Sequence, residues 1–413
     1  MSREEFFLEL SSPFRLDLTV WTLRRRPDNV VDRWDGRTYR RIVPLSSGLV
    51  DTAVTQVGPP ETPRLQVSVE GQSLRSSVRS EVTSILERLL GLRIDLAGFY
   101  RLAALEKELG QLTRRFQGMK PPRYATVFES VVVGIASQQV TRTVSILVLN
   151  RLTESYGAAF HEGDELAHAF PRPEDLADLR SEELRPLGFS RQKERAIAEL
   201  ARSVLEGSLD LEGLAQLRDE EAIERLCSLR GVGRWTAEYV LLRGLGRTQI
   251  FPGDDVGARN NLKRWLGLVQ PLDYEAVRRT LERWHPYAGL IYFHMLLDRL
   301  SEEGVTEASQ PQTGDQTQKK QQPKNTPVKR KFTIGDHVEW NSEAGGVRGT
   351  IRKKLGCPTK FTTYTVRASK EEPQYLIKSD KTDHLAMHKG AALKKIRNVA
   401  EHSPKVKDRK ELR

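Results

Sequence analysis

The pattern of hydrophobic and polar positions differs between two parts of the chain, and the first part is residues 1–95. This part holds short β-rich pieces, "LDLTVWTL", "RTYRRIV" and "PRLQVSVEG", separated by turn signals, and one helical run, "RSSVRSEVTSILERLLGL". Short runs of this kind between turn residues are typical of strands. We therefore predict an antiparallel sheet packed by a helix over residues 1–95.

The second part begins at residue 96 and continues to about residue 300. Apolar residues recur there at spacings of three and four, and short breaks with Gly or Pro separate the runs, which is the pattern of helices. The run "FESVVVGIASQQVTRTVSILVLNRLTESYG" is apolar enough for a buried central helix, and the triplet Ser137, Gln138 and Gln139 interrupts it. The sequence predicts an all-α domain over residues 96–300.

The composition changes beyond residue 300. Residues 301–330 are rich in Gln, Thr, Pro and Lys and nearly lack large apolar residues, which predicts a flexible linker. Residues 331–400 return to short strand-like runs with Gly and Asn turns, which predict a small β-barrel, and residues 401–413 form a basic tail. The expected fold class is multidomain α+β.

Charge is distributed unevenly between these parts. The chain carries a net charge of +11, yet residues 319–413 hold 24 Lys and Arg against 10 Asp and Glu, whereas residues 1–318 hold 42 against 45. A basic appendage indicates an anionic partner, with nucleic acid as the leading candidate and a merely soluble surface as the alternative.

Cysteine content and hydropathy restrict the class of protein further. Cys227 and Cys357 are the only cysteines, so the chain cannot form a four-cysteine iron–sulfur or zinc site by itself. No run of eighteen apolar residues is present, and the start "MSREEFFLEL" lacks an apolar signal core. We expect a cytoplasmic monomer, associated with the nucleoid in a bacterium.

The stretch "LRGVGRWTAEYVLLRGLGRTQIFPGDD" contains the first candidate for chemistry. Two helical runs, 221–230 and 234–245, flank the turn Gly231-Val232-Gly233. Glycine permits a positive φ and a close approach of another chain, and the first N–H groups of the second helix have no intrahelical partner. Such a turn suits a phosphate, with Val232 pointing inward as its anchor. A plain glycine corner between packed helices is the alternative.

Together with the following "FPGDDVGARNNL", this stretch resembles the helix-hairpin-helix DNA glycosylase superfamily, and most of all its 3-methyladenine DNA glycosylase II branch. The segments "FYRLAALEKELGQLTRRFQGMKPPRYATVFESVVVGIASQQVT" and "LGFSRQKERAIAELA" are similar to that branch as well. The resemblance covers residues 96–300 strongly and residues 1–95 weakly. It implies a partner, duplex DNA with damaged bases, and a DNA-binding hairpin that consists of Gly231, Val232, Gly233, Arg234 and Thr236.

Two adjacent aspartates follow the hairpin stretch. Asp254 is interpreted as the cap of the next helix, because Asp is a strong N-cap residue. Asp255 matches the family's catalytic aspartate. A carboxylate at that place stabilises the positive charge that develops on the sugar when an N-glycosidic bond breaks, and it orients or deprotonates the attacking water.

The damaged base has to leave the stack before it reaches this carboxylate. Trp235 and Tyr239 are four residues apart on one helix face, and the resemblance implies that they form the base pocket, where cation–π attraction holds an electron-poor base. Ordinary aromatic core is the alternative. Gln138 and Gln139 stand where the branch places the residue that wedges into the duplex. A tryptophan of the branch is replaced by Leu296, which leaves the shape of the pocket open.

Trp235 also bears on the reaction type. Relatives that cut the DNA backbone have a lysine at this hairpin position, and no lysine occurs here between Lys193 and Lys263. The sequence thus predicts a monofunctional glycosylase of base excision repair that leaves an abasic site. A non-catalytic DNA-binding scaffold and a glycosylase for other damaged or mismatched bases are the alternatives. No cofactor is expected, apart from a monovalent cation on hairpin carbonyls that the resemblance implies.

Residues 331–397 resemble a small Tudor-like domain of the hypervirulence-associated protein family, through "GDHVEWNSEAGGVRGTI" and "FTTYTVRASKEEPQYLIKSDKTDHLAMHKGAALKKI". Trp340, Tyr364 and Tyr375 are candidates for its core or for exposed contacts with a nucleic-acid backbone. We hypothesise that this domain tethers the helical domain to DNA.

Overall fold

The computed structural model describes residues 2–162, 165–180, 182–304, 332–342, 345–356, 359–361, 364–366, 373–380, 385–390 and 393–396. Side chains are described in these ranges except at 162, 340–342, 345–347, 359–361, 364–366, 385–387 and 389. The chain forms two compact units, Met1–Gln312 and Thr313–Arg413. Residues 305–331, which include most of the predicted linker, and the tail 401–413 lie outside the described residues.

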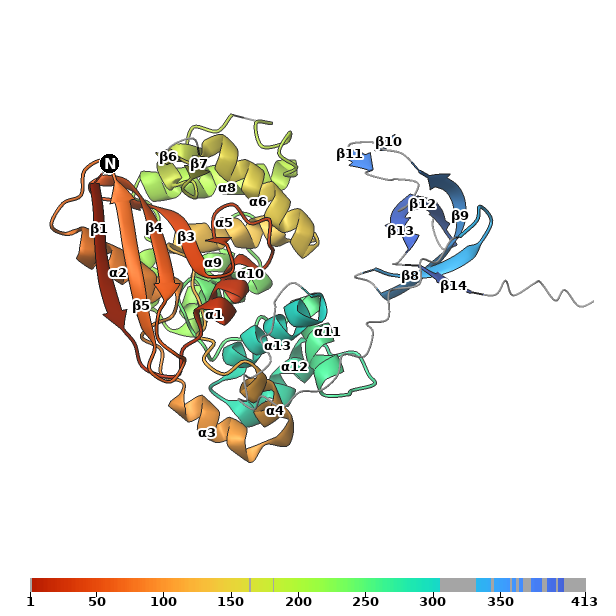
Figure 1. Ribbon diagram of the computed structural model, residues 1–413, viewed down its shortest axis with the longest axis horizontal. Helices are drawn as coiled ribbons and strands as arrows, with labels where there is room; N and C mark the ends of the chain where they lie inside the picture. The colour runs from red at the N-terminus through yellow and green to blue at the C-terminus, as the bar shows by residue number, and fades with distance from the viewer. Residues whose placement is uncertain are drawn as a thin grey trace, which may run out of the picture. The chain divides into compact units, whose positions relative to one another are not determined.

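An antiparallel five-stranded sheet opens the first unit, as the sequence predicts (Figure 1). Its strand order is β1 (Ser2–Glu9), β5 (Arg64–Gly71), β4 (Gly48–Gln56), β3 (Thr38–Leu45) and β2 (Arg33–Trp34). The predicted pieces "RTYRRIV" and "PRLQVSVEG" are β3 and β5, and the predicted helix is α2 (Val78–Leu89). Alternate residues of β5 are buried, since a sheet with one covered face points every second side chain inward.

One predicted strand is wrong. The piece "LDLTVWTL" forms helix α1 (Leu16–Arg24), not a strand. Its β-branched and aromatic residues favour a strand by propensity, but seven of its nine residues are buried, so packing decides the conformation. Because α1 is buried nearly all round, its sequence shows no helical periodicity.

The rest of the first unit is helical, apart from the small hairpin β6 (Ala159–Glu162) and β7 (Glu165–His168). The predicted central run is split at its polar triplet into α5 (Val127–Ser137) and α6 (Arg142–Tyr156). The remaining helices are α3 (Ala97–Leu105), α4 (Lys107–Arg115), α7 (Pro173–Leu176), α8 (Arg191–Leu205), η1 (Glu212–Gln216), α9 (Asp219–Cys227), α10 (Arg234–Arg243), α11 (Val256–Trp265), α12 (Tyr274–Leu281), η2 (Glu282–Trp284) and α13 (Ala288–Glu302).

Two large hydrophobic cores stabilise the described part of this unit, beside a small cluster of Ile42, Phe160 and Ala169. The first joins the sheet and α2 to α5, α6, α8, α9 and α10. The second joins α3, α4, α11, α12 and α13. Helix α1 contributes Val20 and Leu23 to the first core and Leu18 to the second, and α10 likewise contributes Tyr239 to the first and Leu242 to the second. The two cores therefore meet along α1 and α10.

The second unit holds an antiparallel five-stranded sheet of order β13 (Leu385–Lys389), β12 (Gln374–Ser379), β9 (Gly345–Leu355), β8 (His337–Ser342) and β14 (Lys394–Lys395). A separate pair consists of β10 (Thr359–Phe361) and β11 (Tyr364–Val366). Phe332, Val338, Ile351, Tyr375, Ile377 and Leu393 form its described core. Tyr375 is thus a core residue, while the side chains of Trp340 and Tyr364 lie outside the described set.

Among the described residues, no helix combines the length and the apolar character that crossing a membrane requires.

Candidate active site

The glycine turn between α9 and α10 contains two glycines with different structural roles. Gly231 has a φ of +75°, and a Cβ there would lie 2.8 Å from the Cβ of Ala196, so both the backbone and the packing require glycine. A Cβ on Gly233 would have no heavy atom of the protein within 4 Å. The fold therefore explains the first glycine, whereas the second leaves room for something outside the protein.

The N-terminus of α10 is open toward that room. Its N-cap residue is Gly233, so no side chain caps the first N–H groups of the helix. Val232 is 6% exposed and anchors the turn, and Arg234 is exposed beside it. Thr236 is different from these, since its side chain is buried and only its backbone N–H belongs to the first turn. These features give a partial positive charge at an accessible backbone.

The two glutamines at the end of α5 have separate surroundings. The amide of Gln138 donates hydrogen bonds to the carbonyl oxygen of Gly231 at 2.7 Å and to Oγ1 of Thr236 at 2.9 Å. Gln139 is exposed and has a φ of +54°. Lys193 Nζ donates to the carbonyl oxygens of Ala136 and Gln138, at 3.0 and 2.7 Å. Gln138 is therefore fixed to the hairpin, and Gln139 is the one that projects into solvent.

Asp255 begins helix α11 and serves as its N-cap. Its Oδ1 accepts a hydrogen bond from the Ala258 N–H at 2.8 Å. The interpretation of Asp254 as the cap is wrong, because the turn that closes with the Asp255 N–H on the Pro252 oxygen delays the helix by one residue. Asp254 is exposed, with Arg259 at 4.0 Å.

The other oxygen of Asp255 faces a tyrosine. Oδ2 accepts a hydrogen bond from the hydroxyl of Tyr292, on α13, at 3.2 Å. Burial, together with the neighbouring Asp255 carboxylate, raises the pKa of Tyr292 well above its ordinary value. The hydroxyl therefore stays protonated and donates, which holds the carboxylate in a fixed direction.

Helix α10 also determines where the loop before Asp255 lies. Glu238, 4% exposed, accepts a hydrogen bond from the Gly253 N–H at 3.1 Å and another from the hydroxyl of Tyr274 at 2.6 Å. Burial raises the pKa of Glu238, while these two hydrogen bonds oppose the shift. A Cβ on Gly253 would lie 2.7 Å from the ring of Tyr274. The loop is thus tied to the helix that carries the aromatic pair.

The structure brings Trp235 and Tyr239 together, with ring centroids 5.6 Å apart and planes tilted by 31°. Trp235 is half-buried, whereas Tyr239 is only 2% exposed. The Tyr239 hydroxyl lies 2.7 Å from the hydroxyl of Tyr124 and accepts a hydrogen bond from Arg25 Nη1 at 3.2 Å. Trp235 is therefore the more exposed ring of the pair, and the buried ring of Tyr239 packs against it.

Four residues of this arrangement escaped the sequence analysis, namely Arg25, Tyr124, Glu238 and Tyr292. Only Tyr292 had a signal, because it lies four residues before Leu296, the position at which the resemblance places a tryptophan of the pocket. Leu296 follows Tyr292 by one helical turn and is half-buried.

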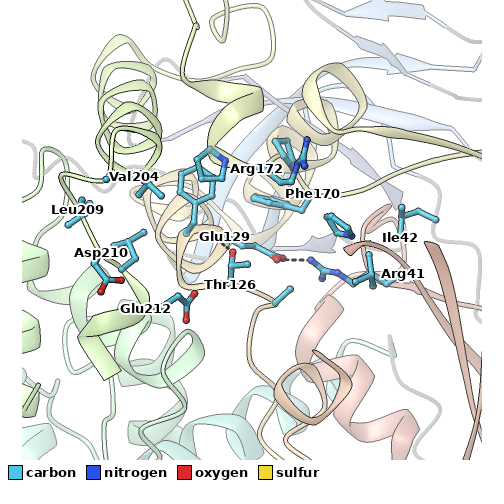
Figure 2. Close-up of a pocket in the computed structure, with 18 residues that line it drawn as sticks. Arg41, Ile42, Thr126, Glu129, Phe170, Arg172, Val204, Leu209, Asp210 and Glu212 are labelled. Carbon is cyan, nitrogen blue, oxygen red and sulfur yellow. Dashed lines mark hydrogen bonds and ion pairs between the residues drawn. The ribbon is translucent and has the colours of Figure 1, made fainter. Parts of the chain in front are cut away.

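A cavity of about 450 Å³ lies elsewhere in the first unit, between β3, the start of α5 and the segments 170–173 and 204–212 (Figure 2). Phe128, Phe170 and other apolar residues form most of its wall. Its buried carboxylate, Glu129, pairs with Arg41 at 2.6 Å, and Arg41 also pairs with Asp32 at 2.7 Å. None of the predicted site residues lines this cavity, and its carboxylate is already neutralised by an arginine.

No group of three or more His, Cys, Asp or Glu side chains suited to a metal ion occurs in the described part of the chain.

Comparisons with known proteins find relatives for both units of the chain. Residues 132–286 match the HhH-GPD superfamily base excision DNA repair protein family, and residues 335–393 match the TUDOR domain of hypervirulence associated proteins. The chain is 28% identical over 283 residues to the Bacillus subtilis protein YfjP, whose name assigns it provisionally as a DNA-3-methyladenine glycosylase, covering 68% of this chain and 94% of YfjP. Another Bacillus subtilis protein, named DNA-3-methyladenine glycosylase, is 29% identical over 221 residues, or 53% of this chain and 73% of its own.

Solved structures extend the likeness to three dimensions. The 3-methyladenine DNA-glycosylase from Archaeoglobus fulgidus superposes with a TM-score of 0.63 at 28% identity, covering 71% of this chain and 98% of that one. An 8-oxoguanine glycosylase/lyase from Clostridium acetobutylicum, solved in complex with double-stranded DNA, has a TM-score of 0.57 at 16% identity and covers 73% and 99%. At that identity the second likeness concerns the fold alone.

Proposed function

We propose that this chain, which carries an HhH-GPD domain of the base excision DNA repair superfamily and a C-terminal TUDOR domain, is a DNA glycosylase. Its substrate is duplex DNA with alkylated bases of the 3-methyladenine type, as in the names of its relatives. The reaction is hydrolysis of the bond between base and sugar, and the product is an abasic site.

One observation carries the proposal. Asp255 stands directly after a loop that Glu238 ties to α10, the helix of the aromatic pair and of the uncapped N-terminus. A single helix therefore relates the positions of a carboxylate, an aromatic surface and an anion-binding backbone. A DNA glycosylase needs these three groups at once, for the sugar, the base and the phosphate.

The reaction follows from these positions. The phosphate backbone binds at the N-terminus of α10, where Gly233 permits close approach. Gln139 enters the gap that the everted nucleotide leaves, while Gln138 braces the loop from the hairpin. The base stacks on Trp235. As the C1′–N bond breaks, the Asp255 carboxylate stabilises the positive charge on the sugar and accepts a proton from the water that attacks C1′.

We propose further that the enzyme does not cut the DNA backbone. Trp235 replaces the lysine through which related lyases form a Schiff base with the sugar. Lys193 lies near Gln138, but its amine donates to two backbone carbonyl oxygens and holds the end of α5. These hydrogen bonds give Lys193 a structural role, so we do not assign it as the amine of a lyase.

The test uses a duplex with one 7-methylguanine and the purified full chain. We expect release of the base and strand cleavage only after alkali, with no covalent complex trapped by borohydride. Nicking before alkali or a trapped complex would contradict the monofunctional assignment alone. Failure to release the base would contradict the proposed function itself.

For the second unit we propose a DNA tether. Arg352, Lys353 and Lys354 are exposed on β9, so they are available to phosphates. Replacing all three with glutamine in the full chain should lower the slope of log affinity against log salt by up to about 3, because each lost phosphate contact removes about 0.9. An unchanged slope would refute the tether.

We also propose that the enzyme acts as a monomer in the cytoplasm and needs no side-chain-bound metal. Gel filtration should then give the mass of one chain, and EDTA should leave the excision rate unchanged. A monovalent cation on the hairpin carbonyls would instead show as a difference in activity between potassium and lithium salts.

A further inference from the structure

A buried arginine from the N-terminal part of the chain lies against the aromatic pair. Arg25 follows the last residue of α1 and is 9% exposed. Its Nη1 donates to the Tyr239 hydroxyl at 3.2 Å. A guanidinium stays protonated in proteins. A fixed positive charge therefore stands at the hydroxyl end of the ring that supports Trp235.

The fold accounts for the backbone of Arg25 but not for the charge of its side chain. Arg25 is the C-cap of α1, and its φ of +59° is the left-handed conformation in which helices commonly end, with its N–H donating to the Trp21 oxygen at 3.0 Å. The Arg25 Nε is buried and has no hydrogen-bond partner among the described residues. A neutral side chain of similar length would fill the space without a buried charge.

Its neighbour in sequence shows the contrast. Arg24 is also buried, but it donates hydrogen bonds to the backbone oxygens of Arg26, Trp34 and Pro27 at 3.0, 2.9 and 2.6 Å. Arg24 therefore holds the chain after α1 in place. Arg25 directs its charge at the candidate site instead.

Asp255 and Arg25 act on the same region with opposite signs. The Tyr292 hydroxyl donates to Asp255 and lies close enough to Arg25 to interact with it electrostatically. Besides burial, which is the main cause, the Asp255 charge raises the pKa of Tyr292, and the charges of Arg243 and Arg25 lower it. The candidate site thus combines the Asp255 carboxylate with a guanidinium at the hydroxyl end of Tyr239.

We propose that the positive charge of Arg25 stabilises the negative charge that the departing base gains, and that it weakens the binding of cationic bases relative to neutral ones. This inference rests on the proposed glycosylase function. When the C1′–N bond breaks, its electron pair leaves with the base, and water oxygen forms the new bond to C1′. A cationic base leaves neutral, and a neutral base leaves as an anion that takes a proton from water. In both cases the base gains one unit of negative charge, so Arg25 stabilises the transition state more than the bound substrate.

The same charge affects binding in a way that depends on the substrate. An alkylated, cationic base such as 7-methylguanine is repelled before the bond breaks, whereas a neutral base such as hypoxanthine is not. Removing the charge should therefore slow excision and yet tighten the binding of the cationic lesion. A purely structural role of Arg25 would weaken both.

The experiment compares Arg25→Met, which keeps the length of the side chain, with Arg25→Lys, which keeps the charge, and with the control Arg24→Met. Single-turnover rates at saturating enzyme are measured on a 7-methylguanine duplex. Affinities for 7-methylguanine and hypoxanthine duplexes are measured by fluorescence anisotropy in the Asp255→Asn background, where base release is too slow to interfere. Urea unfolding verifies that each variant is folded.

For Arg25→Met we expect an excision rate at least tenfold lower than that of the wild type, and Arg25→Lys should restore most of this rate. The Arg25→Met variant should bind the 7-methylguanine duplex severalfold more tightly, and the hypoxanthine duplex equally or more weakly. A parallel change on both duplexes, as expected for Arg24→Met, would overturn the inference, and so would an unchanged rate. A wild-type chain that releases no 7-methylguanine would instead overturn the proposed function.

Discussion

The two carboxylate oxygens of Asp255 have different partners, and substitutions can separate the structural role of one from the proposed catalytic role of the other. Oδ1 caps α11 through the Ala258 N–H, and Oδ2 faces Tyr292 and, in our proposal, the sugar. Asn is as good an N-cap as Asp, and its amide can donate to the Tyr292 hydroxyl in place of accepting from it. Asp255→Asn therefore keeps the local fold and removes only the negative charge.

The size of the catalytic effect follows from Coulomb's law. A carboxylate about 4 Å from a unit positive charge contributes about 4 kcal/mol at an effective dielectric constant of about 20. Since about 1.4 kcal/mol corresponds to a tenfold change in rate, we expect Asp255→Asn to slow excision by about three orders of magnitude. Its free energy of unfolding should change by less than about 0.5 kcal/mol. Asp255→Ala should be equally slow and about 1 kcal/mol less stable, because it also loses the cap.

Asp273 provides the matched control. It caps α12 in the same way, through the Ala276 N–H at 2.7 Å, but it is exposed and makes no contact with the candidate site among those the structure shows. Asp273→Ala should lose about 1 kcal/mol of stability with no change in rate. Single-turnover excision and urea unfolding measure the two quantities. An Asp255→Asn enzyme with more than a tenth of the wild-type rate would refute the assignment, and so would one destabilised as much as Asp255→Ala.

Three further predictions concern other parts of the first unit. Gly233→Ala should leave unfolding unchanged and weaken DNA binding at least tenfold, because a Cβ there meets no protein atom within 4 Å and would stand where we propose that the phosphate binds. Gly231→Ala should destabilise the fold by about 1 kcal/mol or more, and equal unfolding curves for the two variants would contradict this. Gln138→Ala should reduce excision severalfold with little loss of nonspecific DNA affinity, as measured by single-turnover kinetics and anisotropy, because it frees the loop from the hairpin. Burial lowers the pKa of His294 to about 4, so between pH 6.5 and 4 only the unfolded chain takes up a proton at this residue. From pH 7 to pH 5 the free energy of unfolding of the wild type should therefore fall by about 2 kcal/mol more than that of His294→Leu. An equal fall in both proteins, measured by urea unfolding, would contradict this.

The sequence predicted the elements whose information is local. The hairpin glycines, the split of the central helix at Ser137 and the strands β3 and β5 all follow from short-range patterns. The choice between Asp254 and Asp255 as cap depended on a single residue, and the turn at Pro252 decided it. Short-range reasoning has no means to resolve such a difference.

Contacts between distant segments escaped prediction for a physical reason. Arg25 meets Tyr239 across 214 positions of the sequence, and Tyr292 meets Asp255 across 37. No periodicity marks either residue, since each is defined by what the fold places opposite it. Helix α1 was missed for a related reason, because a segment buried on nearly all sides shows no polar face.

The hydrogen bonds of Gln138 fix the distance between two parts of the proposed DNA-binding surface. They join the loop that carries Gln139 to the glycine turn for which we propose phosphate binding, through the Gly231 oxygen and Thr236. In the proposed enzyme the spacing between the held phosphate and the interrogated nucleotide is then constant from one encounter to the next. Each time such an enzyme binds DNA, it would therefore test the nucleotide at one fixed distance from the bound phosphate. Without the hydrogen bonds of Gln138, this distance would vary from one binding event to the next.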